Sequence, residues 1–157
     1  GPLAVVAQGL RERSKDIKLA LADPPGAALH SYYTTGQLKA EGSSIAEGIG
    51  QTRITKNLKG FMPDFSYRIP DAEALDIAFN LVREEGLCLG ASSGVNIAGA
   101  IRLAKELGRG KTIVTVLCDL GMRYQSKMFN PHFLREKGLP VPKWLEQTPL
   151  PPPKVFV

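Results

Sequence analysis

The segment LCLGASSGVNIAGAIRLAKEL, residues 87–107, is the strongest guide to the fold of this chain. Residues 87–89 are apolar, as in a short buried strand, and Gly90-Ala91-Ser92-Ser93-Gly94 is typical of a turn. A helix follows over residues 94–107, where apolar residues recur at helical spacing. A strand, a turn and a helix in this order form one half of a β-α-β unit.

The helix predicted over residues 94–107 is expected to turn one apolar face inward. The residues expected on this inner face are Ile97, Ile101 and Ala104. Arg102 and Glu106 are four residues apart, so they are expected to form an ion pair on the outer face. Gly108 and Gly110 are expected to end the helix.

The chain on either side of this unit continues the alternation of strands and helices. Residues 112–118 contain a nearly continuous run of β-branched and aliphatic side chains, which predicts a strand buried on both faces. Shorter strands are predicted over residues 17–22 and 65–69, and helices over 3–13 and 71–86, the latter capped by Asp71. We therefore expect an α/β fold, a parallel-sheet layer flanked by helices.

Length and composition fit one globular domain with no membrane span. The chain has 157 residues, of which 43% are hydrophobic and 22% charged. No apolar run is long enough to cross a bilayer, and no secretory signal pattern stands at the N-terminus. We expect one domain over residues 1–144 and a proline-rich tail over 145–157, where Pro149-Leu150-Pro151-Pro152-Pro153 is typical of polyproline II.

The charged residues and the cysteines argue against several classes of function. The net charge is +5, but basic residues are scattered and lack aromatic neighbours, so nucleic-acid binding is not expected. A basic surface also suits a small anionic ligand. Cys88 and Cys118 lie in apolar runs, as free thiols do in a reducing compartment, so a cytoplasmic location is expected, with a mitochondrial one as the alternative. His30 and His132 are isolated, so no metal site is expected.

Three loops carry candidate functional residues, and each also has a purely structural interpretation. Ser92 and Ser93 begin a helix whose N-terminus favours an electron-rich acceptor, yet either serine could simply cap that helix. Gly48 and Gly50 would let backbone approach a planar ligand closely, or belong to a flexible surface loop. Asp119 follows the predicted strand 112–118 and is either an acid/base group or a helix cap.

Taken together and in order, seven short motifs of this chain closely resemble the C-terminal part of the cysteine synthases (O-acetylserine sulfhydrylases). That family belongs to the fold type II pyridoxal-phosphate enzymes, and the resemblance runs from about residue 3 to about residue 144. The motifs are Ala22-Asp23-Pro24, Gly26-Ala27-Ala28, Glu41-Gly42-Ser43-Ser44-Ile45, Glu47-Gly48-Ile49-Gly50, Glu85-Gly86-Leu87, Gly90-x-Ser92-Ser93-Gly94 and Arg123-Tyr124-x-Ser126.

The resemblance implies pyridoxal 5'-phosphate as cofactor and assigns it a set of binding residues. Ser92 matches the serine that hydrogen-bonds the pyridine nitrogen, and a hydroxyl beside a helix N-terminus disfavours a protonated ring. The cofactor-binding residues implied in this way are Ser92, Gly48, Gly90, Cys118 and Asp119. The residues implied at the substrate entrance are Gly48, Ile49 and Gly50.

The resemblance also implies that part of the enzyme lies outside this chain. In the family, the lysine that anchors the cofactor and the loop that holds its phosphate both precede the matched region. None of the lysines here, such as Lys39 or Lys111, stands in that lysine's motif, and Gly1-Pro2 and Val5 depart from the expected end of the phosphate loop. We therefore expect no catalytic residue in this chain and no activity from the chain alone.

The whole protein implied by the resemblance is a homodimer that converts O-acetylserine and sulfide to cysteine and acetate. A cystathionine β-synthase or a β-cyanoalanine synthase remains an alternative, because the residues that select the substrate lie largely outside the matched region. A third alternative is a non-catalytic interaction module that pairs with an intact subunit.

Overall fold

Helices and two short strands follow one another through residues 2–147, which the computed structural model describes. The α-helices are α1 (Pro2–Arg13), α2 (Leu29–Thr35), α3 (Asp71–Asn80), α4 (Ala91–Leu107) and α5 (Pro131–Glu136). The strands are β1 (Ala20–Asp23) and β2 (Phe65–Arg68), and short helical turns are η1 (Lys56–Leu58), η2 (Leu81–Glu85), η3 (Gly121–Tyr124) and η4 (Lys143–Glu146). The predicted polyproline stretch lies outside the described residues.

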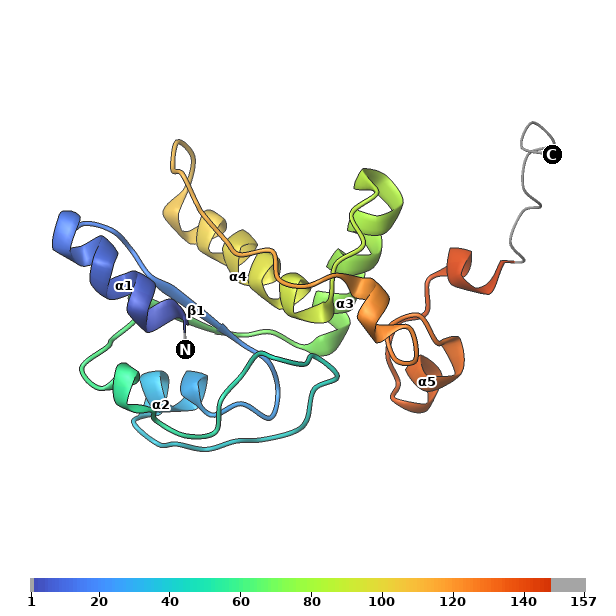
Figure 1. Cartoon of the computed structure of the whole chain (residues 1–157), viewed down its shortest axis with the longest axis horizontal. Helices are drawn as coiled ribbons and strands as arrows, with labels where there is room; N and C mark the ends of the chain where they lie inside the picture. The colour runs from blue at the N-terminus through green and yellow to red at the C-terminus, as the bar shows by residue number, and fades with distance from the viewer. Residues whose placement is uncertain (1, 148–157) are drawn as a thin grey trace.

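The two strands confirm the predicted parallel sheet. Strands β1 and β2 pair in parallel, with Ala20 opposite Phe65 and Asp23 opposite Arg68. They run between α4 and α2 in the view of Figure 1. Helix α4 lies close against β1 because Gly99 has no side chain there: a Cβ at Gly99 would come within 2.7 Å of the Ala22 Cβ. The architecture is therefore α/β, with helices on a small parallel sheet.

The core consists of three clusters of buried side chains. The first joins α3 to the start of α4 and to the region around α5, with Leu75, Met128 and Leu134 almost fully buried. The second joins α1, β1, α2 and η1, and the third joins α3 and α4 through residues such as Ile69 and Val95. Among the residues that the structure describes, no helix is long and apolar enough to cross a membrane.

The strand predicted over residues 112–118 is absent. This segment is extended but has no paired strand among the described residues, and it runs back alongside α4 (Figure 1). Val114 is 87% exposed and Val116 is 66% exposed. A run of β-branched side chains forms a strand only where neighbouring backbone completes the ladder, and residues 2–147 place no such backbone beside this run. Within the described part of the chain, one isolated antiparallel bridge forms nearby, between Leu89 and Leu120. This bridge is also all that remains of the strand predicted over 87–89.

The buried face of α4 differs from the predicted one. Ile101 is 43% exposed and Ala104 is exposed, while Val95, Ala98 and Leu103 are buried. The reason is that small residues determine which side of the helix approaches its neighbours. Gly94 lies against the backbone of Ala74 in α3, and this contact rotates the larger apolar residues away from the core.

Two predicted polar interactions are also replaced by others. Arg102 pairs with Glu73 of α3 and not with Glu106, which instead accepts a hydrogen bond from the Tyr67 hydroxyl. Burial, followed by this bond to Glu106, raises the pKa of Tyr67 to about 12. Asp71 does not cap α3, which it begins; its carboxylate accepts hydrogen bonds from the Ser44 hydroxyl and the Ile45 amide and so fastens the loop before β2.

The imidazole of His30 makes the stability of this fold depend on pH. Its Nδ1 lies 2.9 Å from the Ser66 Oγ, and burial, with the positive charges of Arg68 and Arg102, lowers the pKa of His30. The folded state therefore favours the neutral ring, and the stability that this ring contributes above pH 6.5 is lost as the pH falls. Urea unfolding between pH 7.5 and 5.5 is expected to show a decreasing free energy of unfolding. The decrease should be smaller in His30→Asn; an unchanged pH profile in that variant would contradict this origin.

Candidate functional site at the start of helix α4

The two serines at the start of α4 have different environments, although they are adjacent in sequence. Helix α4 begins at Ala91 with Gly90 as the preceding extended residue, and no side chain caps it, so the capping interpretation of both serines is wrong. Ser93 is fully buried, and its Oγ accepts a hydrogen bond of 2.8 Å from the Cys118 amide. Ser92 is 5% exposed, and its hydroxyl has no hydrogen bond to any residue of the described chain. Ser93 is thus structural, and Ser92 remains available to a ligand.

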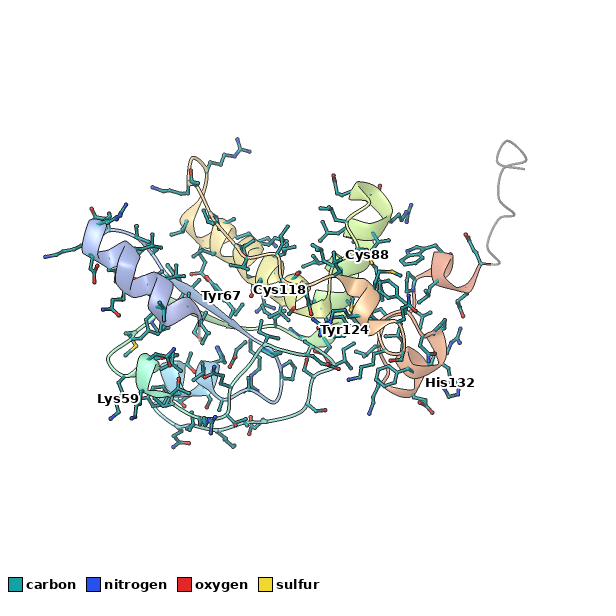
Figure 2. All side chains as sticks on the ribbon, in the orientation of Figure 1. Lys59, Tyr67, Cys88, Cys118, Tyr124 and His132 are labelled. Atoms are coloured by element: carbon teal, nitrogen blue, oxygen red, sulfur yellow. The ribbon has the colours of Figure 1, made fainter. Side chains whose placement is uncertain are left out.

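Residues 118–124 are fastened to the start of α4 by backbone contacts. The Gly90 amide donates to the Asp119 carbonyl at 3.0 Å, and the Gly121 amide donates to the Cys88 carbonyl at the same distance. A Cβ on Gly90 would lie 2.8 Å from the Tyr124 ring and 2.9 Å from an Asp119 carboxylate oxygen. Figure 2 shows Cys118 and Tyr124 on the side of the molecule where α4 begins. The structure therefore brings Gly90, Ser92, Cys118 and Asp119 together.

Asp119 forms a small polar group with two residues of η3. Its carboxylate accepts a hydrogen bond from the Tyr124 hydroxyl and lies 3.4 Å from the Arg123 guanidinium. The hydrogen bond to Asp119 raises the pKa of the Tyr124 phenol, which therefore stays protonated. Asp119 does not cap η3, because that turn begins after Leu120 without a side-chain cap. Tyr124 was not among the predicted site residues, although it lies in the motif Arg123-Tyr124-x-Ser126, which was the available signal.

The glycine loop predicted at the substrate entrance is anchored on both sides. Ile49 packs against the cluster that contains Val95 and Ala98 of α4. Gly50 has a φ of 85°, and a Cβ there would come within 2.8 Å of the Ala27 Cβ. Gly48, with a φ of 73°, has open space where its side chain would be. Gly48 and Gly50 are exposed, so the segment is a surface loop, as one of the two interpretations expected. Gly48 leaves room for a ligand to approach its backbone.

The loop also reaches the polar group around Asp119. Glu47 pairs with Lys127, and its charge contributes to the raised pKa of Tyr124.

Two hollows, of about 520 and 630 Å³, lie beside Trp144 and beside Phe129, and neither includes Ser92, Gly48 or Asp119. The described residues contain no group of three or more His, Cys, Asp or Glu side chains that could hold a metal ion.

A family model supplies the decisive comparison. The model described as a pyridoxal-phosphate dependent enzyme matches residues 1–119 of this chain. The chain belongs to the pyridoxal-phosphate-dependent enzymes. The matched region includes helix α4, the glycine loop and Asp119, so the residues gathered at the start of α4 lie within the part that carries the family's pattern.

Among the curated relatives of this chain are fungal cysteine synthases. Cysteine synthase 1 of Neurospora crassa is 44% identical over 144 residues, which are 88% of this chain and 38% of the relative. Cysteine synthase 1 of Emericella nidulans is also 44% identical, over 154 residues, covering 94% of this chain and 42% of the relative. The chain thus spans about two fifths of the length of the relatives it matches.

Solved structures of the same enzyme class confirm the fold. An O-acetylserine dependent cystathionine beta-synthase from Helicobacter pylori superposes with a TM-score of 0.71 at 30% identity, over 80% of this chain and 39% of that one. O-acetylserine sulfhydrylase isoform 3 from Entamoeba histolytica superposes with a TM-score of 0.68 at 30% identity, over 80% and 36%. The fold type II architecture expected from the sequence is therefore confirmed.

The residues at the start of α4 fit one side of a bound pyridoxal ring. The Ser92 hydroxyl has no hydrogen-bond partner within residues 2–147, and it stands in the first turn of a 17-residue helix whose N-terminus carries partial positive charge. Gly48 leaves open space on the neighbouring loop. An unprotonated ring nitrogen can accept a hydrogen bond from a neutral hydroxyl such as that of Ser92. An ionised carboxylate could not donate this hydrogen bond.

Proposed function

We propose that this chain forms the ring-nitrogen side of the active site of a cysteine synthase, the enzyme that replaces the acetoxy group of O-acetylserine with sulfide. The observation that carries the proposal is the unpartnered hydroxyl of Ser92, held at the start of α4 beside the segment 118–124. The similarity to fungal cysteine synthases supports the substrate assignment. Gly48, Gly90, Cys118 and Asp119 complete the proposed cofactor-binding set, and Gly48, Ile49 and Gly50 border the substrate entrance.

The proposed roles of these residues follow from their chemistry. Pyridoxal phosphate, when bound, supplies the electron sink that makes a substrate α-proton acidic and allows the β-substituent to leave. Ser92 would donate its Oγ proton toward the ring nitrogen and leave that nitrogen unprotonated, which a carboxylate at the same place would not do. Asp119 accepts the Tyr124 hydroxyl proton and so holds the wall of the site in one position. The glycine loop would exclude bulky side chains from the substrate path.

The proposal assigns the catalytic lysine and the phosphate loop to polypeptide other than these 157 residues. Mixed with pyridoxal phosphate alone, the chain is therefore expected to lose all Schiff-base absorbance on gel filtration, because none of its lysines has the family's anchoring motif. The measurement is an absorbance spectrum of the eluted protein. A stable chromophore at one cofactor per chain would refute this assignment.

Reconstitution tests the activity itself. The section of Neurospora crassa cysteine synthase 1 that precedes the matched region is co-expressed with this chain, and cysteine formation from O-acetylserine and sulfide is measured. We expect activity from the pair and none from either part. If the two parts purify together with bound cofactor but form no cysteine, the proposed function fails. Formation of homodimers by the reconstituted enzyme, and a cytoplasmic or mitochondrial location, remain predictions.

A second candidate function is supported by the structural neighbour from Helicobacter pylori, an O-acetylserine dependent cystathionine beta-synthase. The reconstituted enzyme distinguishes the two, since a cystathionine β-synthase accepts homocysteine in place of sulfide. A higher kcat/KM for homocysteine than for sulfide would favour this second candidate.

A further inference from the structure

Two side-chain oxygens with almost no exposed surface lack a hydrogen-bond partner among the described residues, the Tyr33 hydroxyl and the Oε1 of Gln51. A buried acceptor without a donor destabilises the folded state, so each such atom calls for an explanation. Such an atom in a native protein reflects local strain, a role in catalysis, or a water molecule or ion bound there. The residues around these two oxygens differ, and so does the explanation for each oxygen.

Tyr33 is explained by the packing of its ring. The ring lies edge-on to Phe61, with 5.9 Å between centroids, and packs on the cluster that contains Leu21 and Leu29. This cluster joins α1, β1, α2 and η1, and it contains none of the residues proposed to bind cofactor or substrate. Packing of the large Tyr33 ring buries the hydroxyl attached to it, so no ligand is needed to explain why this hydroxyl is buried.

The backbone of Gln51 is fastened to the start of α2. Its carbonyl oxygen accepts a hydrogen bond of 2.8 Å from the Ala28 amide. Its neighbour Gly50 lies against Ala27 and Pro24, and Ile49 packs on α4. Gln51 thus follows directly after the loop proposed to border the substrate entrance, on backbone anchored from two sides. The buried amide oxygen has no hydrogen-bond partner among the described residues.

We propose that Gln51 is a positioning residue for the sulfur nucleophile, whose S–H group donates a hydrogen bond to the Gln51 Oε1. This inference rests on the proposed function. A neutral amide oxygen suits a weak, uncharged donor such as a thiol or hydrogen sulfide, whereas an ammonium group would require a carboxylate to balance its charge. Gly48, three residues before Gln51, has open space where a side chain would stand, whereas Gly50 lies against Ala27 and Pro24.

The first test measures stability and needs no cofactor. Gln51→Met keeps the side-chain volume but removes the orphan oxygen, so the melting temperature of the chain is expected to rise by about 2–6 °C. Tyr33→Phe, the matched control, removes the other orphan and is expected to raise it similarly. A lower melting temperature in Gln51→Met would mean that the amide supports the fold, and it would overturn the proposal.

The second test separates the two substrates in the reconstituted enzyme. With sodium hydrosulfide and O-acetylserine as probes, Gln51→Met is expected to raise the KM for sulfide about tenfold and to leave the KM for O-acetylserine within about twofold. Tyr33→Phe should change neither KM. An active wild type whose Gln51→Met variant keeps its KM for sulfide overturns the role of Gln51 alone. A wild type that forms no cysteine overturns the proposed function and this inference with it.

Discussion

Gly94→Ala is expected to abolish stable folding of this chain at room temperature. A Cβ at this position would lie 2.1 Å from the carbonyl oxygen of Ala74 and 2.8 Å from its carbonyl carbon. Both atoms belong to the backbone of α3, so no flexible side chain can move aside. Separating α3 from α4 would open the cluster of Ile69, Ala74, Val95 and Ala98. We expect a loss of about 3–5 kcal/mol, a large part of the stability of a domain of this size.

Gly9→Ala is the matched control, because Gly9 also lies inside a helix but has nothing within 4 Å of its absent side chain. This substitution should stabilise the chain by about 0.5–1 kcal/mol through the helix preference of alanine. Urea unfolding followed by circular dichroism measures both variants. If Gly94→Ala unfolds at the same urea concentration as the wild type, the close approach of α3 to α4 described here is wrong.

Ser92→Ala and Ser93→Ala are expected to have opposite consequences. Ser93 is buried, and its Oγ accepts a hydrogen bond from the Cys118 amide. Replacing Ser93 leaves that amide without a partner and should lower the free energy of unfolding by about 1–3 kcal/mol. Ser92 has no such bond, so its replacement should change stability by less than about 0.5 kcal/mol. In the reconstituted enzyme, however, Ser92→Ala should weaken retention of pyridoxal phosphate about 10- to 100-fold, because the donor to the ring nitrogen is lost.

The two serine variants act as controls for each other. Urea unfolding of the chain gives the stability of each variant, and fluorescence titration with the cofactor gives the affinity of each reconstituted enzyme. Unchanged cofactor affinity in Ser92→Ala, together with normal folding, would contradict the assignment of this serine. A stable Ser93→Ala would show that the bond to the Cys118 amide contributes little to holding residues 118–124 against α4.

Local sequence patterns located several elements, including two strands that are stabilised by pairing with each other from distant parts of the chain. Helices α1 and α3 and the strands around residues 20–23 and 65–68 appear where apolar spacing placed them. The motifs also indicated the family and the three loops that meet at the start of α4. The capping role of Asp71 was wrong, because the Ser44 hydroxyl and the Ile45 amide compete for its carboxylate from far along the chain.

Residues 112–118 show most clearly where sequence reasoning fails. Their β-branched side chains favour a strand, yet a strand is stable only when other backbone pairs with it, and which backbone lies nearby is not a local property. The same reason explains the inner face of α4. Close contacts made by its small residues set which face is buried, and Ile101 therefore lies outside the core.

For this protein, the sequence alone determined the α/β class, helices α1, α3 and α4, strands β1 and β2, and the serine and glycine motifs of a pyridoxal-phosphate enzyme. Only the tertiary structure distinguished Ser92 from Ser93, joined Asp119 to Tyr124, and exposed Gln51 as an acceptor without a donor. Hydrogen-bond partners come from segments distant in sequence, and their absence becomes visible only when the whole neighbourhood of an atom is in place.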